Sequence, residues 1–111
     1  MSILVDLNGT IAKEGKPIQK TIDYLKTVTE DIYIISGSTV SKIQEYEVLL
    51  DSLGIKYVDI ILNPINENTD ISFKTRMAMT IPNLSFAIDN NVKILAAYRD
   101  AGIKAIDVRD L

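Results

Sequence analysis

The chain has 111 residues, of which 47% are hydrophobic and 24% are charged, and it contains neither cysteine nor histidine. This composition predicts one compact soluble domain, residues 1–111, that forms a core without disulfides. The net charge of −3 argues against a basic surface that wraps duplex nucleic acid. Thiol nucleophiles, Ser-His triads and the usual zinc sites are excluded, so any catalysis must use carboxylates, hydroxyls, lysine or a hard metal ion.

The start of the chain lacks the basic segment and the cleavage site of a secretory signal. No apolar run approaches the ~20 residues that a membrane-spanning helix needs. We therefore predict a cytoplasmic protein that does not bind membranes.

Five short runs rich in isoleucine and valine predict the strands of a parallel sheet, because strands that are buried on both faces have continuous apolar sequences. These runs are residues 3–5, 32–35, 57–61, 84–88 and 104–106.

Four helical patterns lie between the predicted strands. The first follows Pro17, and the second starts after Ser38 or Thr39 as its cap and stops at Gly54. The third runs over about residues 70–80, and the fourth starts near Asn90 or Asn91 and ends at Gly102. The residues placed inward by these patterns are Ile18, Ile22, Leu25, Ile43, Tyr46, Leu50, Leu53, Phe73, Met77, Val92, Leu95 and Ala96.

Regular alternation of strands and helices predicts an α/β fold, a three-layer Rossmann-like sandwich with a mostly parallel five-stranded sheet. Ligands of such sheets bind beyond the carboxyl ends of the strands. Three of the apolar runs end there in a small polar residue, namely Asp6, Ser36 and Asp89. Any one of them could simply begin a turn. The three together, each followed within two residues by Gly or Asn, favour a functional site.

Two carboxylates at adjacent strand ends repel each other unless a cation lies between them. Oxygen ligands of this kind suit Mg²⁺, which in turn attracts phosphate. The sequence therefore points to phosphate chemistry at this edge of the sheet.

The segment Asp6-Leu7-Asn8-Gly9-Thr10 resembles the first motif of the haloacid dehalogenase (HAD) superfamily of phosphotransferases, which is normally Asp-x-Asp-Gly-Thr. Ser36-Gly37 resembles the second motif, Lys74 the third, and Asp89-Asn90-Asn91 the fourth. The four motifs occur in the correct order and cover nearly the whole chain. The resemblance is closest to small phage-type proteins similar to the phosphatase domain of polynucleotide kinase-phosphatase.

This resemblance implies a Mg²⁺-dependent phosphatase that hydrolyses phosphate monoesters through an aspartyl-phosphate, with Asp6 as the nucleophile. It implies that Ser36 donates a hydrogen bond to the phosphoryl group and that Lys74 neutralises its charge, although periodicity alone favours a solvated helix residue for Lys74. The implied catalytic residues are Asp6, Asn8, Ser36 and Lys74, the phosphate-binding residues are Gly9, Ser36, Gly37 and Lys74, and the Mg²⁺ ligands are Asp6, Asp89 and the backbone carbonyl of Asn8.

Asn8 stands where phosphatases of this family have the Asp that protonates the leaving group. An amide cannot do this, and the loss of acid-base help typically costs ~10²–10⁴ in rate, so we expect low activity. Two explanations are open. In the first, Asn8 is an engineered replacement in an active parent, which is favoured because Asp6, Ser36, Lys74 and Asp89 are all retained. In the second, a natural chain has lost or altered hydrolysis.

Two further positions depart from the family pattern. Ser38 stands where many relatives have a phosphate-binding Arg, and Asn90 stands where a second Asp is common. Asn90 and Asn91 could contact the metal through a neutral carbonyl or a water, or could act only as helix caps.

The chain has no room for a cap domain. The segment between Thr10 and Ile18 is long enough only for a hairpin that turns near Glu14-Gly15. The sequence of residues 64–70 predicts a polar loop. The predicted site is therefore open. It favours a polynucleotide end, or a phosphorylated small molecule in a homo-oligomer whose second subunit closes the pocket.

Two alternatives belong to other classes. One is a non-catalytic phosphate-binding or regulatory protein on the same scaffold. The other is a receiver-like phosphorylation switch, which is disfavoured because the paired acidic residues expected ahead of the phosphorylated Asp are absent.

Overall fold

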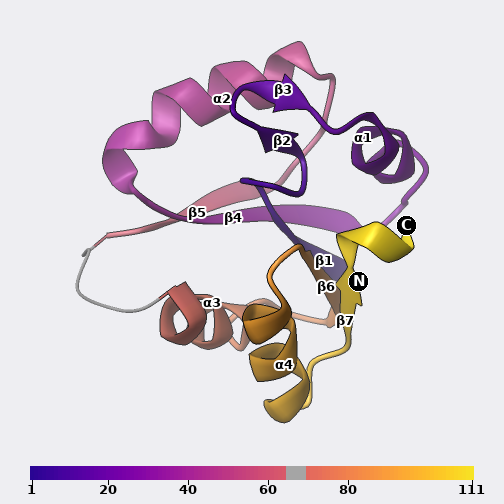
Figure 1. The fold of residues 1–111 in the computed structure, drawn as a ribbon, viewed down its shortest axis with the longest axis vertical. Helices are drawn as coiled ribbons and strands as arrows, with labels where there is room; N and C mark the ends of the chain where they lie inside the picture. The colour runs from indigo at the N-terminus through magenta and orange to yellow at the C-terminus, as the bar shows by residue number, and fades with distance from the viewer. Residues whose placement is uncertain (65–69) are drawn as a thin grey trace.

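Each isoleucine-rich run contributes to one strand of a parallel sheet in the computed structural model, which describes residues 1–64 and 70–111. The strand order is β5-β4-β1-β6-β7, so β1 lies in the middle (Figure 1). All neighbouring strands run parallel. The strands are β1 (Ser2–Asp6), β4 (Asp31–Thr39), β5 (Asp59–Asn63), β6 (Leu84–Asp89) and β7 (Ala105–Asp107).

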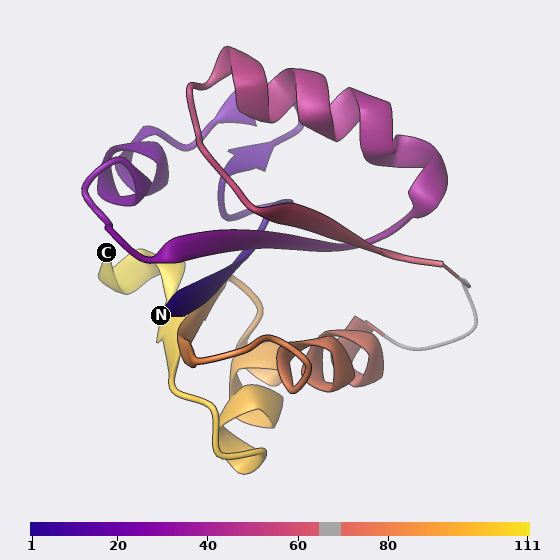
Figure 2. The same ribbon diagram turned by 180° about the vertical axis from the view of Figure 1, so that it is seen from behind.

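Helices cover both faces of the sheet, as Figures 1 and 2 show. On one face lie α1 (Gln19–Leu25), the short 3₁₀ helix η1 (Val40–Lys42) and α2 (Ile43–Ser52). On the other face lie α3 (Asp70–Ala78) and α4 (Val92–Asp100). A 3₁₀ helix, η2 (Val108–Asp110), follows β7. The predicted three-layer α/β sandwich is confirmed.

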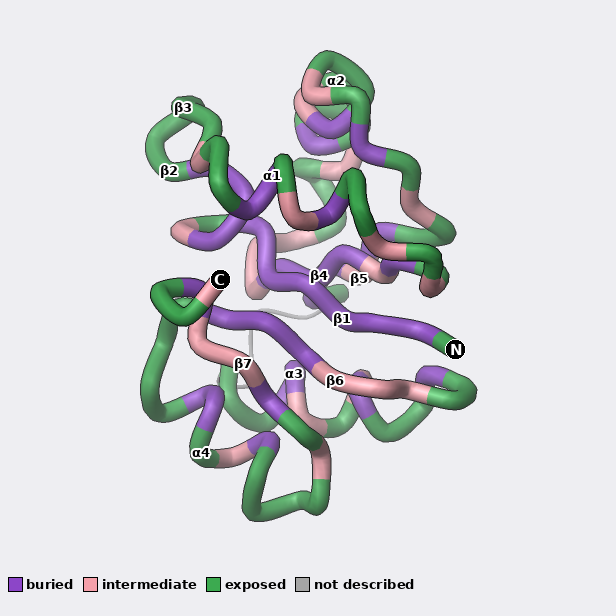
Figure 3. Tube along the Cα trace, turned by 90° about the vertical axis from the view of Figure 1, so that its right-hand side faces the viewer, coloured by how far each residue is buried: buried purple, intermediate pink, exposed green. Residues whose placement is uncertain are grey.

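The central strand β1 is buried along its whole length (Figure 3). Because side chains alternate along a strand, Ile3 and Val5 pack in the core beneath α1 and α2, whereas Leu4 packs in the core beside α3 and α4. This double burial fixes the position of Asp6 at the end of β1. Within the described residues, every helix is too short or too polar to cross a membrane.

The predicted hairpin is present and consists of β2 (Ala12–Lys13) and β3 (Lys16–Pro17). Its turn residues Glu14 and Gly15 have φ angles of 52° and 77°. Two successive positive φ values are typical of the tight turns that join antiparallel strands. The polar loop predicted at 64–70 includes residues 65–69, which lie outside the described residues.

The element boundaries differ from the sequence prediction by a few residues. β4 continues to Thr39, β5 begins only at Asp59, and α3 ends at Ala78. The second helical segment begins after Thr39 as predicted, but it begins as the 3₁₀ helix η1, and the Thr39 side chain makes no cap bond. Gly54 and Gly102 follow α2 and α4 with φ angles of 71° and 83°, as expected for residues that end helices.

The prediction that Val92 and Ala96 face the core is wrong. Both side chains are exposed, and Val92 retains 61% of its accessible surface. The buried face of α4 consists instead of Ile94, Leu95 and Tyr98. Two sets of apolar residues, Val92 with Ala96 and Ile94 with Tyr98, have helical spacing in this segment. Contact with α3 and the sheet buries the set that contains Tyr98.

This register of α4 predicts effects of very different size on the free energy of unfolding for two truncations. Leu95→Ala should lower the free energy of unfolding by about 2–5 kcal/mol, because it opens a cavity at a residue that is 1% exposed. Val92→Ala should change it by less than about 0.5 kcal/mol, because the side chain contacts solvent. Urea denaturation of both variants measures the difference, and equal losses would contradict the observed register.

Candidate functional site

The carboxyl edge of the sheet brings the predicted site residues together. The chain passes from β1 to β4 and β5 on one side and returns to β6 and β7 on the other, so β1 marks the topological switch point. Asp6 ends β1 and Asp89 ends β6. Ser36 lies in β4 where the register with β5 shifts. This is the edge that the sequence predicted.

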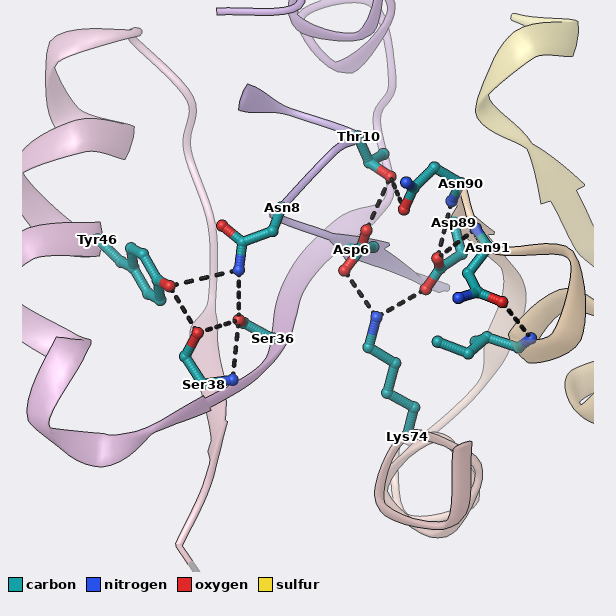
Figure 4. Close-up of polar contacts among 11 residues, drawn as sticks. Asp6, Asn8, Thr10, Ser36, Ser38, Tyr46, Lys74, Asp89, Asn90 and Asn91 are labelled. Atoms are coloured by element: carbon teal, nitrogen blue, oxygen red, sulfur yellow. Dashed lines mark hydrogen bonds and ion pairs between the residues drawn. The ribbon is translucent and has the colours of Figure 1, made fainter. Parts of the chain in front are cut away.

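Lys74 lies between the two carboxylates (Figure 4). Its Nζ donates to Asp6 Oδ1 at 2.7 Å and to Asp89 Oδ2 at 2.8 Å. None of the three side chains is more than 4% exposed. Lys74 is therefore a buried ion-pair residue, and the solvated position favoured by periodicity alone is wrong.

The remaining carboxylate oxygens also accept hydrogen bonds. Thr10 Oγ1 donates to Asp6 Oδ2 at 2.9 Å. The backbone N–H groups of Asn90 and Asn91 donate to Asp89 Oδ1 at 2.7 and 3.0 Å. These bonds come from the first and fourth motifs and satisfy acceptors that burial would otherwise leave unpaired.

Asn90 and Asn91 have different side-chain roles. With its amide nitrogen turned toward the carboxylates, Asn90 donates to Asp6 Oδ2 at 2.9 Å and to Asp89 Oδ1 at 3.2 Å. Asn91 caps α4, because its Oδ1 accepts from the N–H groups of Lys93 and Ile94. The sequence left both roles open for both residues.

Burial and charge act together on this cluster. Burial and the charge of Asp89 raise the pKa of Asp6 while Lys74 lowers it, and the net result is a pKa of about 6. Burial alone would lower the pKa of Lys74, but the charges of Asp6 and Asp89 outweigh it and leave that pKa raised. The ammonium therefore stays charged, and the cluster has a net negative charge when both carboxyl groups are ionised.

A second polar cluster lies beside the first and contains Asn8, Ser36, Ser38 and Tyr46 (Figure 4). Asn8 Nδ2 donates to Ser36 Oγ at 2.9 Å and to the Tyr46 hydroxyl at 3.3 Å. The Ser38 and Tyr46 hydroxyls are 2.8 Å apart. Sequence reasoning placed Tyr46 only in the core and did not identify this contact, which no motif indicates.

A pocket of about 410 Å³ opens between the two clusters. The predicted residues Asp6, Asn8, Gly37, Lys74 and Asp89 line it, together with Ser38, Asp70, Asn90, Asn91 and Ile94.

The structure adds the burial and contacts of three predicted residues, which the motifs do not specify. Ser36 is completely buried behind the pocket wall. Gly9 has a φ of 82°, and its N–H donates to Ala12 O at 2.8 Å, so that N–H is already engaged. At Gly37 a Cβ would lie 2.2 to 2.7 Å from the carboxylate atoms of Asp70, so a larger residue there would displace the Asp70 side chain.

The donor set suits a hard cation that completes its shell with water or substrate. In residues 1–64 and 70–111, no three Asp or Glu side chains form a group that could hold a metal ion by themselves. Asp6 and Asp89 nevertheless provide two carboxylates in one buried, net negative cluster. Mg²⁺ is commonly bound by one or two carboxylates and several waters, so these residues fit it.

The two ion pairs predict a large loss of stability when the Lys74 ammonium is removed. Lys74→Met should lower the free energy of unfolding by about 3–5 kcal/mol at pH 7, because it leaves two buried carboxylates without their shared partner. The loss should shrink at low pH, where the carboxyl groups take up protons. Urea denaturation at two pH values tests this, and a loss that is the same at both values would contradict it.

Asp6→Asn should have the opposite effect at pH 7, because it removes the excess negative charge of the cluster. The pKa of Asp6 is about 6 in the folded protein against an ordinary value of 3.8. The stabilising contribution of this group is therefore fully present below pH 3.8 and is lost as the pH rises through about 6. We expect the stability gain of Asp6→Asn, measured in metal-free buffer, to be larger at pH 7 than at pH 4.

No family model matches the chain, and no curated protein matches it. Among solved structures, the chain is similar to one in the "Structure of the Pnkp1/Rnl/Hen1 RNA repair complex", with a TM-score of 0.79 and 15% sequence identity. The match covers 96% of this chain and 41% of the other, so this chain spans less than half of that protein's length. At this identity the likeness establishes the α/β fold.

Proposed function

We propose that the chain is a capless phosphatase of the HAD type, which hydrolyses phosphate monoesters through an aspartyl-phosphate. The observation that carries this proposal is the buried cluster of Asp6, Lys74 and Asp89 at the switch point of the sheet. A nucleophilic carboxylate, a fixed ammonium and a second carboxylate in one pocket are the groups that such chemistry needs.

In the proposed reaction, the ionised Asp6 carboxylate attacks phosphorus. A bond forms between Asp6 and phosphorus, and the bond from phosphorus to the alcohol oxygen breaks. Lys74 lies 2.7 Å from Asp6 and offsets the charge that accumulates as the phosphoryl group arrives. Water then attacks the phosphorus of the aspartyl-phosphate and releases inorganic phosphate, which returns Asp6 to its carboxylate form.

The step of this reaction that lacks a catalytic group is the protonation of the leaving alcohol. The alcohol oxygen needs a proton as its bond to phosphorus breaks, and the Asn8 amide cannot supply one. Both N–H groups of that amide are directed at the Ser36 and Tyr46 hydroxyls. The chain as it stands must therefore take this proton from water, which supports the proposal of low activity.

Mg²⁺ is the proposed cofactor, and when bound it neutralises phosphate charge and orients the substrate. Asp6, Asp89 and the backbone carbonyl of Asn8 would hold it. Asp70 also lines the pocket, so three carboxylates and one lysine surround the phosphate position. A phosphate dianion needs further positive charge in such surroundings, which supports a divalent cation. In the orientation that donates to both carboxylates, the Asn90 amide would have to turn its oxygen toward that cation.

The proposed substrate is a polynucleotide end or a phosphorylated small molecule. In the described residues, the segment between β1 and α1 forms only the β2-β3 hairpin, which leaves the pocket without a cap. An open pocket suits a large substrate or a second subunit of a homo-oligomer that closes it. The fold likeness to a chain of an RNA repair complex supports the polynucleotide end.

A second candidate is a phosphate-binding or regulatory protein without catalysis. The observation that favours it is the Asn8 side chain, which is hydrogen-bonded and not titratable. Both candidates require the same phosphate pocket, and they differ only in whether the acid-base residue is needed.

Asn8→Asp separates the two candidates. For a phosphatase, we expect Mg²⁺-dependent release of phosphate from a 3′-phosphorylated oligonucleotide to rise by about 10²–10⁴-fold, because its alcohol leaving group needs a proton and a titratable group returns to that side. The double variant with Asp6→Asn is the control and should show no turnover. Failure of Asn8→Asp to release phosphate from any monoester would favour the binding protein.

The metal proposal has a separate test. Calorimetric titration of the unchanged chain with Mg²⁺ should show one binding event, and Asp89→Asn should weaken it at least about 10-fold, since one of the two carboxylate ligands is lost. Asp107→Asn is the matched control, because Asp107 ends the neighbouring strand β7 and pairs with Arg109 outside the pocket. Unaltered Mg²⁺ affinity in Asp89→Asn would exclude the assigned ligand set.

A further inference from the structure

Ser36 and Ser38 compete for the role of hydroxyl donor to the bound phosphate. The motif assigns this role to Ser36, but the hydrogen bonds of Ser36 already use its hydroxyl fully. Ser36 Oγ accepts from Asn8 Nδ2 at 2.9 Å and from the backbone N–H of Ser38 at 3.2 Å. Its own proton is donated to Ser38 Oγ at 3.2 Å.

The burial of the two serines also favours Ser38 as the donor. Ser36 has no exposed surface, whereas Ser38 is half-buried and lines the pocket that also contains Asp6 and Lys74. A group that bonds to a phosphoryl oxygen must reach the pocket surface. Ser38 meets this condition, and Ser36 lies one layer behind it.

Tyr46 completes the arrangement from the helix side. Its hydroxyl lies 2.8 Å from Ser38 Oγ, and either oxygen can donate. If Tyr46 donates, Ser38 Oγ accepts from both Ser36 and Tyr46, and its own proton is free to point into the pocket. If Ser38 donates instead, no donor faces the pocket from this hydroxyl. The two arrangements differ only in the rotation of two O–H bonds.

An anion in the pocket selects between these arrangements, because it interacts favourably only with the one that offers a donor. We propose that Ser38 supplies the hydroxyl that binds the phosphoryl group and that Tyr46 is the positioning residue that orients it. This inference rests on the proposed phosphate chemistry of the pocket, and it transfers the hydroxyl role from Ser36 to Ser38, which stands where many relatives have an Arg. Ser36 then holds Ser38 in place from behind.

The hydrogen bonds of Tyr46 support its role in orienting the Ser38 hydroxyl. Tyr46 is 8% exposed, and its hydroxyl already accepts from Asn8 Nδ2 at 3.3 Å, which favours the arrangement in which its own O–H donates to Ser38. A donation from Tyr46 polarises the Ser38 O–H and strengthens its bond to an anion. Removing the Tyr46 hydroxyl alone should therefore weaken phosphate binding without any direct contact.

The test measures binding of inorganic phosphate to the unchanged chain in the presence of Mg²⁺, by calorimetry or ³¹P NMR. We expect Ser38→Ala to weaken phosphate binding by about 10-fold or more, as for a hydrogen bond to a charged group, and Ser38→Thr to retain most of it. Ser41→Ala is the matched control, because Ser41 is exposed in the adjacent 3₁₀ helix η1 and its hydroxyl bonds to Thr39. It should leave the affinity unchanged.

A double-mutant cycle tests the role of Tyr46. Tyr46→Phe should weaken phosphate binding about 3-fold in the unchanged chain and should have no effect once Ser38→Ala is present, because the orientation of Ser38 then no longer matters. A purely structural role of Tyr46 would give equal losses in both backgrounds and would overturn the positioning role.

Ser36→Ala separates this inference from the motif assignment. If phosphate binds but Ser36→Ala weakens it more than Ser38→Ala does in folded protein, checked by circular dichroism, Ser36 is the donor and the inference is wrong. If the unchanged chain binds no phosphate at all, the proposed function fails and this inference fails with it. A larger loss of phosphate affinity in Ser38→Ala than in Ser36→Ala supports both, because Ser36 acts only by holding Ser38 in place.

Discussion

The rest of the site depends on one constraint, the burial of two carboxylates that share a single ammonium. Asp6 and Asp89 end neighbouring strands, so the sheet itself brings their charges together. Lys74 reaches them from α3 and is nearly inaccessible to solvent. Charges in such surroundings must be paired and hydrogen-bonded, and this requirement accounts for the donors supplied by Thr10 and by the start of α4.

The pocket therefore has two chemically distinct sides. One side is ionic and consists of the carboxylates with Lys74, and the other is a neutral network of hydroxyls and one amide. Asn8 belongs to the neutral side, because its Nδ2 donates to Ser36 and Tyr46. Tyr46 ties that side to α2, whereas Lys74 ties the ionic side to α3. A phosphate bound between them would contact elements from both faces of the sheet.

The fold alone does not assign this chemistry, since one α/β scaffold supports many functions. The likeness to a chain of the Pnkp1/Rnl/Hen1 RNA repair complex covers 96% of this chain at 15% identity, so it concerns the arrangement of elements. The case for phosphate chemistry rests on the side chains at the switch point. Under the proposed function, the identity of residue 8 would decide between hydrolysis and binding, because this position would exchange protons with the leaving group.

The sequence by itself determined the α/β class, the order of the strands along the chain and the carboxyl edge that holds Asp6 and Asp89. It could do so because local signals, namely apolar runs that end in polar residues and glycines that end helices, report on a residue's immediate neighbours. Lys74 was identified only from its motif, since its helical periodicity indicated a solvated position. The inward face of α4 was misassigned because two apolar stripes satisfied the same helical period.

Only the tertiary structure decided which groups touch. The Tyr46 hydroxyl meets Ser38 and Asn8 because α2 packs across the sheet at that point, and no spacing along the chain encodes this contact. The burial of Ser36 behind Ser38 has the same origin, as does the close approach of Asp70 to Gly37. Contacts between residues far apart in sequence depend on packing geometry, which the local pattern of the chain does not specify.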